Sequence, residues 1–550
     1  MIQLQNFLSL LKKLMAYNFF SQNSHKKIKV LKKISSILFL KPLFPCIIFL
    51  SFSFLFADIS PSIQGIYKSL DPHSLSQLFA FYELYPKTNE GKKALKKALK
   101  LLHAENLQKK SFSLPKIDIE FIISLINDKN LNEIQLQKEQ LELIEELGKN
   151  LCNRKLKGHK VKEEKDLFSL AAEEIDIARA IFLSSIGPKD NNQQKMRSYE
   201  AFLDLMALQV LARLNKDSTN IDKIQAINQF IFFEMHFRYP PRSLEAKEID
   251  TFTFLPSVMD GRRGVCLGVS ILYLCIAQRI GLPLEIATPP GHIFLRYKHN
   301  GEYINIETTA RGIHLPTEIY LGIETHQLTK RNYKDVIGLS FMNLASVAWG
   351  KENFPQAVKL YEKALPYLPE DYMLKEFLGY NYLFCGRKKE GIRLLKEVKN
   401  HLPSFSVSKE TIAQDYLNKK TDEEGIKAVF LSIDETRESI ILKQKKIQDI
   451  LKKFPHFRAG ILQLANTYLQ LSRSKEAQNI LKTYEKIDPN EPIVNYYLSA
   501  ISFERYDFPS AWKYLKKTEK LLQPFSHFPR GLQQLKISLK RKCPEPKEKF

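Results

Sequence analysis

Apolar residues recur at three- and four-residue steps along most of this chain, which is the spacing of amphipathic α-helices. Residues 58–152 follow this pattern without any constellation of catalytic side chains, so we expect a helical support domain there. Residues 153–166 are charged and poor in apolar side chains, which predicts a linker. The helical pattern then resumes, and its helix over residues 222–239 is expected to end at Pro240, because proline cannot continue a helix.

Residues 266–280 are apolar on nearly every face, which predicts a helix buried at the centre of a domain and ended by Gly281. After that glycine the pattern changes to short runs that predict strands. The runs are 284–287, 292–297 and 302–307. The dipeptide Asn300-Gly301 favours a tight hairpin turn, so we expect the last two strands to pair with each other.

The helical pattern becomes periodic from residue 338 onward. Residues 338–371 resemble one 34-residue tetratricopeptide unit, in which small side chains let two helices cross closely. The residues at the expected offsets are Ala345, Ala357, Tyr361, Ala364 and Pro369. Further units start at residues 372, 458 and 492, with a degenerate helical stretch over 404–457. We therefore expect a repeat domain over 338–524, followed by a tail, 525–550, that ends in disordered residues.

Residues 1–57 have the composition of a targeting segment. A basic stretch at 25–33 precedes fifteen uncharged, mostly apolar residues at 43–57, which suits a signal peptide better than a spanning helix. The alternatives are an uncleaved anchor over 36–57 and an amphipathic helix of a cytosolic protein, although the apolar run has no polar face. We expect export to the periplasm or cell envelope, with this segment meeting the membrane during export or as an anchor.

Charge and cysteine content narrow the classes of function. The net charge is +23, but lysines are spread along most helices, often beside glutamate, and no nucleic-acid-binding motif is present. We therefore predict no nucleic-acid partner, while attraction to anionic envelope polymers stays open. The cysteines show no CxxC pair and no regular spacing, which argues against a disulfide framework or a metal site. They are Cys46, Cys152, Cys266, Cys275, Cys385 and Cys543.

Three residues within this central stretch form the candidate catalytic site. Cys266 falls in the first turn of the buried helix, where the helix dipole favours the nucleophilic thiolate. If Asn300-Gly301 forms the turn, His292 and Glu307 share one face of the hairpin as diagonal neighbours, roughly 5 to 8 Å apart. Glu307 would then orient the imidazole of His292, and His292 would deprotonate Cys266.

A purely structural interpretation of the same residues stays open. Cys266 would be a buried helix cysteine, His292 a residue at a strand end, and Glu307 a solvated partner of Arg296 or Arg311. The helix-strand-strand order of the three candidates favours a genuine site over this alternative.

The stretch resembles the transglutaminase-like, papain-related superfamily, and within it the bacterial SirB-type branch, in which tetratricopeptide repeats often follow the core. The resemblance covers about residues 167–312 and the repeats. The matching residues are Arg262, Arg263, Gly264, Ser270, Leu272, Tyr273, Leu274, Ala277, Arg279, Gly281, Leu282, Pro283, Leu284, Pro290, Gly291, His292, Arg296, Tyr297 and Ile306. Members of the superfamily place Cys, His and Asp in the order found here, and the acid in this chain is Glu307.

The resemblance implies an α+β transglutaminase-like core at 167–325 in a mainly α chain. Many members of the branch lack the nucleophile, whereas this chain has Cys266. One expected function is thiol acyl transfer on an amide or peptide substrate, as a protease, amidase or transglutaminase, without cofactor or metal. The other is an inactive scaffold, in which the repeats bind a protein or peptide partner.

Overall fold

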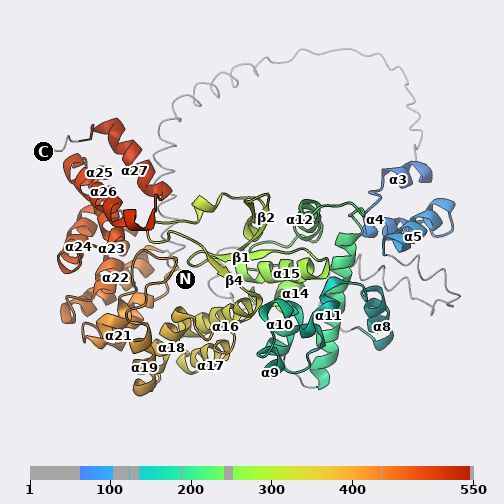
Figure 1. The fold of residues 1–550 in the computed structure, drawn as a ribbon, viewed down its shortest axis with the longest axis horizontal. Helices are drawn as coiled ribbons and strands as arrows, with labels where there is room; N and C mark the ends of the chain where they lie inside the picture. Colours follow the sequence, from blue (N-terminus) through green and yellow to red (C-terminus); the bar gives the residue numbers. More distant parts are fainter. Residues whose placement is uncertain are drawn as a thin grey trace, which may run out of the picture.

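The computed structural model describes residues 62–102, 123, 136–186, 190–240, 252–434 and 436–545, arranged as Figure 1 shows. The expected leader, residues 1–57, lies outside these ranges, so the signal peptide or anchor stays a prediction. Within the ranges described, no helix combines the length and the apolar character needed to cross a membrane. The chain is mainly helical and contains one small sheet, which confirms the predicted fold class.

The first described helices form a small unit at the end of the molecule away from the C-terminal helices (Figure 1). They are α3 (Ile63–Ser69), α4 (Leu75–Leu84) and α5 (Asn89–Leu101), whereas α8 (Lys138–Leu147), after a gap, packs on α11 (Asp190–Leu211). Helices α4 and α5 pack against each other and bury Phe79, Ala94 and Ala98 completely. Thr88 begins α5 by accepting a hydrogen bond from the backbone N–H of Gly91, as an N-cap residue does.

The central domain is built around the apolar helix that the sequence predicts. Its helices are α9 (Glu164–Leu167), α10 (Ile177–Ile186), α11 (Asp190–Leu211), α12 (Asn220–Asn228), α14 (Leu255–Gly261) and α15 (Cys266–Arg279). Nearly every residue of α15 is buried, because α10, α11 and α14 all pack against it. Gly281 follows α15 with a φ of +65°, a conformation that glycine adopts without strain.

The segment 153–166, predicted as a linker, is folded into this domain. Two short 3₁₀ turns, Cys152–Lys155 and Lys157–Lys160, bring Asn153, Arg154 and His159 inward, while the lysines of the segment stay exposed. Asn153 is fully buried and donates to Asp176, and Arg154 forms an ion pair with Asp204. The charged composition of the segment predicts a spacer. In the structure, however, its Arg154 and His159 pair with the buried carboxylates of Asp204 and Asp176, which lie later in the chain.

The helix expected over 222–239 ends earlier. Helix α12 stops at Asn228 and continues only as a π-helical turn, Gln229–Glu234. The backbone of Arg238 then bonds to Arg262 and Gly264 instead of to the preceding turn. The chain therefore leaves the helix before Pro240, with His236 at a φ of +57°.

The sheet has four antiparallel strands in the order β3-β2-β1-β4. They are β1 (Glu285–Thr288), β2 (Phe294–His299), β3 (Glu302–Ile306) and β4 (Thr329–Arg331). His299 pairs with Glu302 across a turn in which Asn300 and Gly301 both have positive φ, so the predicted hairpin and its register are confirmed. Leu295 on β2 is fully buried, and β2 packs on α15. Strand β4 was not expected.

Helical hairpins follow the sheet and curve away from it (Figure 1). Their helices are α16 (Tyr333–Gly350), α17 (Phe354–Ala364), α18 (Tyr372–Phe384), α19 (Lys388–Val398), α20 (Ile412–Leu417), α21 (Glu423–Phe430), α22 (Arg437–Lys453), α23 (Arg458–Gln470), α24 (Ser474–Ile487), α25 (Pro492–Glu504) and α26 (Phe508–Leu522). Helices begin at residues 372, 458 and 492, where the repeat pattern places new units. A Cβ atom on Gly391 would lie 2.8 Å from the carbonyl of Gly379, so α18 and α19 cross closely at glycine.

The C-terminal tail includes one helix. Residues 530–542 form a further helix, α27 (Arg530–Lys542), which packs on α26. Leu532, Leu535 and Leu539 are buried in the contact, since their spacing places them on one face of the helix. The predicted tail from residue 525 therefore contains a helix, and its last residues, 546–550, lie outside the described ranges.

The segment after β3 joins the sheet to the repeats. Backbone hydrogen bonds run from His326 to Phe405 (2.9 Å) and from Val407 to Glu324 (2.9 Å). Arg331 on β4 also forms an ion pair of 2.9 Å with Asp371 at the start of α18. Because backbone pairing and an ion pair both cross this junction, the central domain and the repeats pack as neighbours with a defined orientation.

Candidate active site

Cys266 is the first residue of α15 and is partly buried. The backbone before it is held in place, because the N–H of Val265 donates to Phe252 and that of Gly264 to Arg238. A side chain at position 268 would collide with the carbonyl of Phe252, so Gly268 permits this close approach. The sulfur thus lies at the positive end of a buried helix, as the sequence predicts.

His292 lies two residues before β2, not within it. Gly291, with a φ of +73°, and the bond from the His292 N–H to Pro289 (3.1 Å) form a turn that delays the strand until Phe294. The predicted strand start at residue 292 was therefore wrong. The turn places the imidazole at the edge of the sheet, with its side chain 15% exposed.

The three predicted residues are in contact. Nε2 of His292 lies 2.7 Å from Oε2 of Glu307, and Cys266 is the other neighbour that acts on the imidazole. Burial lowers the pKa of His292, but the bonds and opposite charges of Cys266 and Glu307 outweigh it and raise the pKa to about 10. The geometry therefore favours an imidazolium held between a sulfur and a carboxylate.

Glu307 is 3% exposed and accepts hydrogen bonds on both oxygens. Oε2 accepts from His292 and from the hydroxyl of Tyr320 (2.7 Å), while Oε1 accepts from the backbone N–H (3.1 Å) and the hydroxyl (2.5 Å) of Thr309. Burial raises the pKa of Glu307, but His292 and these hydroxyl donors more than compensate, so the pKa lies below its ordinary value. The structural alternative made Glu307 a solvated partner of Arg296 or Arg311. It does not describe this carboxylate, because Glu307 is buried and Arg296 pairs with Glu285.

Tyr320 is a site residue that the sequence did not indicate. Besides bonding Glu307, its ring stacks on His292, with centroids 5.9 Å apart and planes 15° apart. Its other contact is Phe294, whose ring stacks on it at 4.2 Å. Tyr320 follows Glu307 by thirteen residues in an irregular segment, so no periodicity connects the two.

The other candidate side chains have structural surroundings. Cys275 is completely buried in α15, and burial raises the pKa of its thiol well above the usual range. His314 accepts a hydrogen bond from the backbone N–H of Asn305, and His299 is exposed beside the hairpin turn. Among the described residues, no three His, Cys, Asp or Glu side chains are placed to hold a metal ion.

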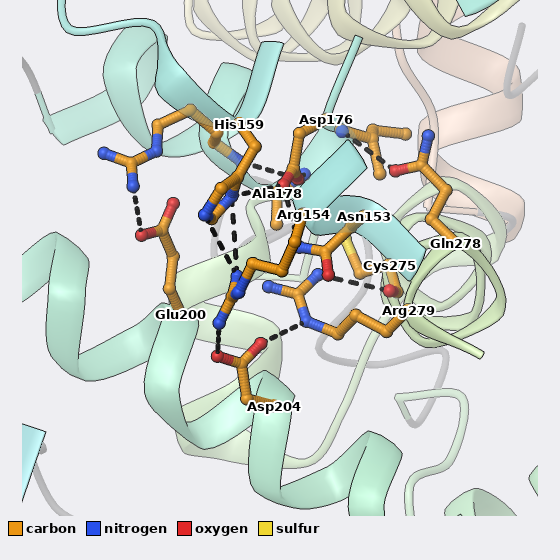
Figure 2. A network of polar contacts seen from close by, with 12 residues as sticks. Asn153, Arg154, His159, Asp176, Ala178, Glu200, Asp204, Cys275, Gln278 and Arg279 are labelled. Atoms are coloured by element: carbon orange, nitrogen blue, oxygen red, sulfur yellow. Dashed lines mark hydrogen bonds and ion pairs between the residues drawn. The ribbon is translucent and has the colours of Figure 1, made fainter. Parts of the chain in front are cut away.

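A polar network supports the far end of α15, as Figure 2 shows. Arg279 is 1% exposed, and its Nε donates to Asp204 on α11 at 2.8 Å. Asp204 also pairs with Arg154, whose guanidinium contacts His159, which in turn lies 3.1 Å from Asp176. Burial raises the pKa of Asp176, but His159 and Arg279 outweigh it, so the carboxyl stays ionised. The network fixes α15 to the segment 153–166 and to α11.

Comparison with known proteins agrees with this architecture. The family model of the transglutaminase-like superfamily matches residues 197–334, so the chain contains a transglutaminase-like domain that includes Cys266, His292 and Glu307. No curated protein matches the chain.

Several solved helical-repeat structures resemble part of the chain. A crystal structure of MamA protein is 15% identical, with a TM-score of 0.19, and covers 34% of this chain and 93% of its own. A thermophilic TPR protein of Thermus thermophilus is 15% identical, with a TM-score of 0.19. The match covers 37% of this chain and 97% of that protein. The TPR2AB domain of yeast Sti1, in complex with pHSP90, is 16% identical, with a TM-score of 0.20 and coverages of 38% and 90%.

Proposed function

We propose that the transglutaminase-like domain catalyses thiol acyl transfer, with Cys266 as nucleophile, His292 as acid and base, and Glu307 as the group that orients the imidazole. The observation that carries the proposal is the chain of contacts from the Cys266 side chain through His292 to the buried Glu307. A nucleophile, a base and an orienting acid placed next to one another are the arrangement that nucleophilic catalysis requires, which supports the proposal.

The arrangement supports a two-step reaction. The Cys266 thiolate attacks a carboxamide carbon, and the tetrahedral intermediate collapses to a thioester as His292 gives its proton to the leaving amine. The neutral imidazole then takes a proton from water or from a second amine, which attacks the thioester and releases the thiol. Water gives hydrolysis and an amine gives transamidation. The backbone N–H of Cys266, at the positive end of α15, is the proposed oxyanion donor.

Glu307 contributes by fixing the ring. Because Nε2 of His292 bonds the carboxylate, the other ring nitrogen is left to face the sulfur. The bonds of Glu307 to Thr309 and Tyr320 keep the carboxylate from following the imidazole when the ring changes charge. Glutamate in place of the family's aspartate is therefore compatible with an orienting role.

The second candidate function is a catalytically inactive scaffold that acts through its repeats. It is favoured by the large cavity, about 1080 Å³, that the repeats form beside the site. In that case the repeats bind a protein or peptide partner and the Cys266 centre is a relic of the fold.

For either function, we place the protein in the SirB-type branch, because repeats follow its core. We place it in the periplasm or cell envelope because of the composition of residues 1–57. An anchor over residues 36–57 is the alternative to a cleaved signal. Fractionation of cells that produce the full chain, with N-terminal sequencing of the mature protein, tests both.

Alkylation of the native protein with iodoacetamide, followed by peptide mass spectrometry, separates the two functions. We expect Cys266 to react at least about tenfold faster than the same cysteine in urea, and His292→Ala to abolish this advantage. Cys275→Ala is the matched control, because Cys275 is on the same helix but buried, and it should leave the rate unchanged. Equal rates for native and unfolded Cys266 would contradict catalysis and favour the scaffold.

A further inference from the structure

One lysine is buried in the wall of the large cavity that the repeats form. Lys443 on α22 is 2% exposed, and it is the only buried lysine among the residues that the structure describes. It lines the cavity together with Val429, Phe430 and Ser432 at the end of α21. Buried lysines are rare in proteins, so this side chain is unusual in a chain whose other described lysines are solvated at least in part.

The amine of Lys443 has little to stabilise a positive charge. Its Nζ donates one hydrogen bond, of 3.0 Å, to the backbone carbonyl of Leu431, although an ammonium group has three N–H donors. Burial is the cause that lowers the pKa of Lys443 to about 7, and no carboxylate opposes it. A large fraction of the side chain is therefore a neutral amine near neutral pH.

The charged side chains elsewhere in the lining do not act on Lys443. They come from other elements of the chain and include both signs, and none of them contributes to the lowered pKa of this lysine. They are Glu318, Glu324, Glu376, Glu410, Glu491, Lys351, Lys409 and Arg530. Lys443 is therefore a desolvated amine, not one half of an ion pair.

The wall beside Lys443 is aromatic. Phe430 packs against Trp349, with ring centroids 4.8 Å apart, and against Phe377, with centroids 5.8 Å apart. All three rings line the cavity, whose volume is about 1080 Å³. The space next to the amine thus favours an apolar or aromatic molecule over a charged one.

A buried acceptor lies at the same level of the α22–α23 hairpin. Gln444, the residue after Lys443, donates to Thr467 on α23 at 3.1 Å. Thr467 follows Asn466, which also lines the cavity and whose Oδ1 is buried without a hydrogen-bond partner among the described residues. A buried acceptor without a donor is costly, so a ligand hydroxyl at this point would be stabilised.

We propose that Lys443 is a nucleophilic amine that captures an apolar or aromatic aldehyde in this cavity as an imine. The lone pair of the neutral Nζ attacks the carbonyl carbon, and the carbonyl oxygen becomes the hydroxyl of a carbinolamine, which donates to Oδ1 of Asn466. Water then leaves with that oxygen and the two amine hydrogens, and the C=N bond forms. No oxidant or reductant is needed. The site is separate from the thiol chemistry proposed above and does not depend on it.

The competing interpretation gives Lys443 a purely structural role. Leu431 is the C-cap residue of α21, and a lysine that donates to its carbonyl stabilises the end of that helix. A lysine that only caps a helix is shielded by its burial, so it reacts more slowly than an exposed one. The two interpretations therefore predict opposite orders of reactivity.

Reductive labelling of the native full chain tests the proposal. The protein is incubated with benzaldehyde and sodium cyanoborohydride at pH 7, and benzylated lysines are quantified by peptide mass spectrometry. We expect Lys443 to be labelled at least about tenfold faster than Lys445 and Lys446, which are exposed on the same helix, because an ordinary lysine with a pKa of about 10.4 is almost fully protonated at pH 7. In urea the three rates should be equal. Equal or slower labelling of Lys443 in the native chain overturns the proposal.

Two further arms test the amine and the class of ligand. Lys443→Arg keeps a donor for Leu431 but removes the nucleophile, so the fast benzyl adduct should disappear from the intact mass, whereas Lys446→Arg should keep it. Persistence of the fast adduct in Lys443→Arg overturns the proposal. With glyoxylate, an anionic aldehyde without a ring, we expect the advantage of Lys443 over Lys446 to fall at least about fivefold. An equal or larger advantage with glyoxylate overturns the apolar class of ligand.

Discussion

Nε2 of His292 and Oε2 of Glu307 lie 2.7 Å apart, joined across the end of the β2–β3 hairpin. The bond links a histidine that precedes one strand to a glutamate that follows the other, so the hairpin register and the turn before β2 together bring the two residues into contact. Because Glu307 is also bonded by Thr309 and Tyr320, the imidazole is oriented by a carboxylate that cannot rotate freely.

Replacing that carboxylate by an amide tests its role. Glu307→Gln keeps the shape but removes the negative charge, so the imidazolium form of His292 loses its stabilisation. We expect the alkylation rate of Cys266 at pH 7 to fall about tenfold or more, which corresponds to about 1.4 kcal/mol. Glu285→Gln, on the same sheet but paired with Arg296 and Lys330, should leave the rate within about twofold. A normal rate in Glu307→Gln would contradict the orienting role.

The raised pKa of His292 predicts how stability depends on pH. A histidine whose pKa is raised to about 10 in the folded state binds its proton more tightly there than in the unfolded chain, where the pKa is about 6.5. Its stabilising contribution is therefore complete below about pH 6.5 and is lost as pH rises towards 10. Urea unfolding of the native protein and of His292→Gln should show a stability difference that shrinks between pH 6.5 and pH 10. If the stability difference between the two proteins grows from pH 6.5 to pH 10, His292 is not held as a charged imidazolium in the folded state.

Tyr320→Phe separates the hydrogen bond of Tyr320 from its stacking. The variant removes the hydroxyl that Glu307 accepts but keeps the ring against His292 and Phe294. A hydrogen bond to a charged group is worth about 1.5–3 kcal/mol, so we expect the alkylation rate of Cys266 to fall roughly tenfold, with an altered pH profile. Tyr303→Phe is the control, because Tyr303 contacts Arg296 on the same sheet away from the site. If Tyr320→Phe lowers the midpoint of thermal unfolding but leaves the pH dependence of Cys266 alkylation unchanged, Tyr320 has only a structural role.

The buried network behind α15 predicts a large effect on stability. Asp204→Asn leaves Arg279 and Arg154 without their carboxylate, and Arg279 is 1% exposed. Breaking a buried pair from one side costs about 3–5 kcal/mol, which chemical denaturation would measure as a lower unfolding midpoint. The exposed pair Arg197–Glu145 provides the contrast, since Arg197→Gln should cost no more than about 1 kcal/mol. Similar small losses for both variants would mean that the network carries little of the stability.

Local features of the sequence were sufficient for the buried helix and the hairpin. The uninterrupted apolar run after Cys266 can only be a core helix, and Asn300-Gly301 supports the positive φ angles of a two-residue turn. Strand periodicity then sets the register, which is why the sequence is enough to pair His292 with Glu307. These features depend on residues close together in the chain, where propensity and periodicity act directly.

Long-range packing decided the rest. Tyr320 reaches Glu307 from an irregular segment, Arg154 turns inward to Asp204 on a later helix, and the backbone of Arg238 pairs with Arg262 and Gly264. The cavity arises where the junction segment meets several repeats, so its lining residues come from separate elements. From the sequence alone came the order and spacing of Cys266, His292 and Glu307. Which side chains surround them depends on tertiary contacts, because burial and charge compensation are properties of neighbours distant in the chain.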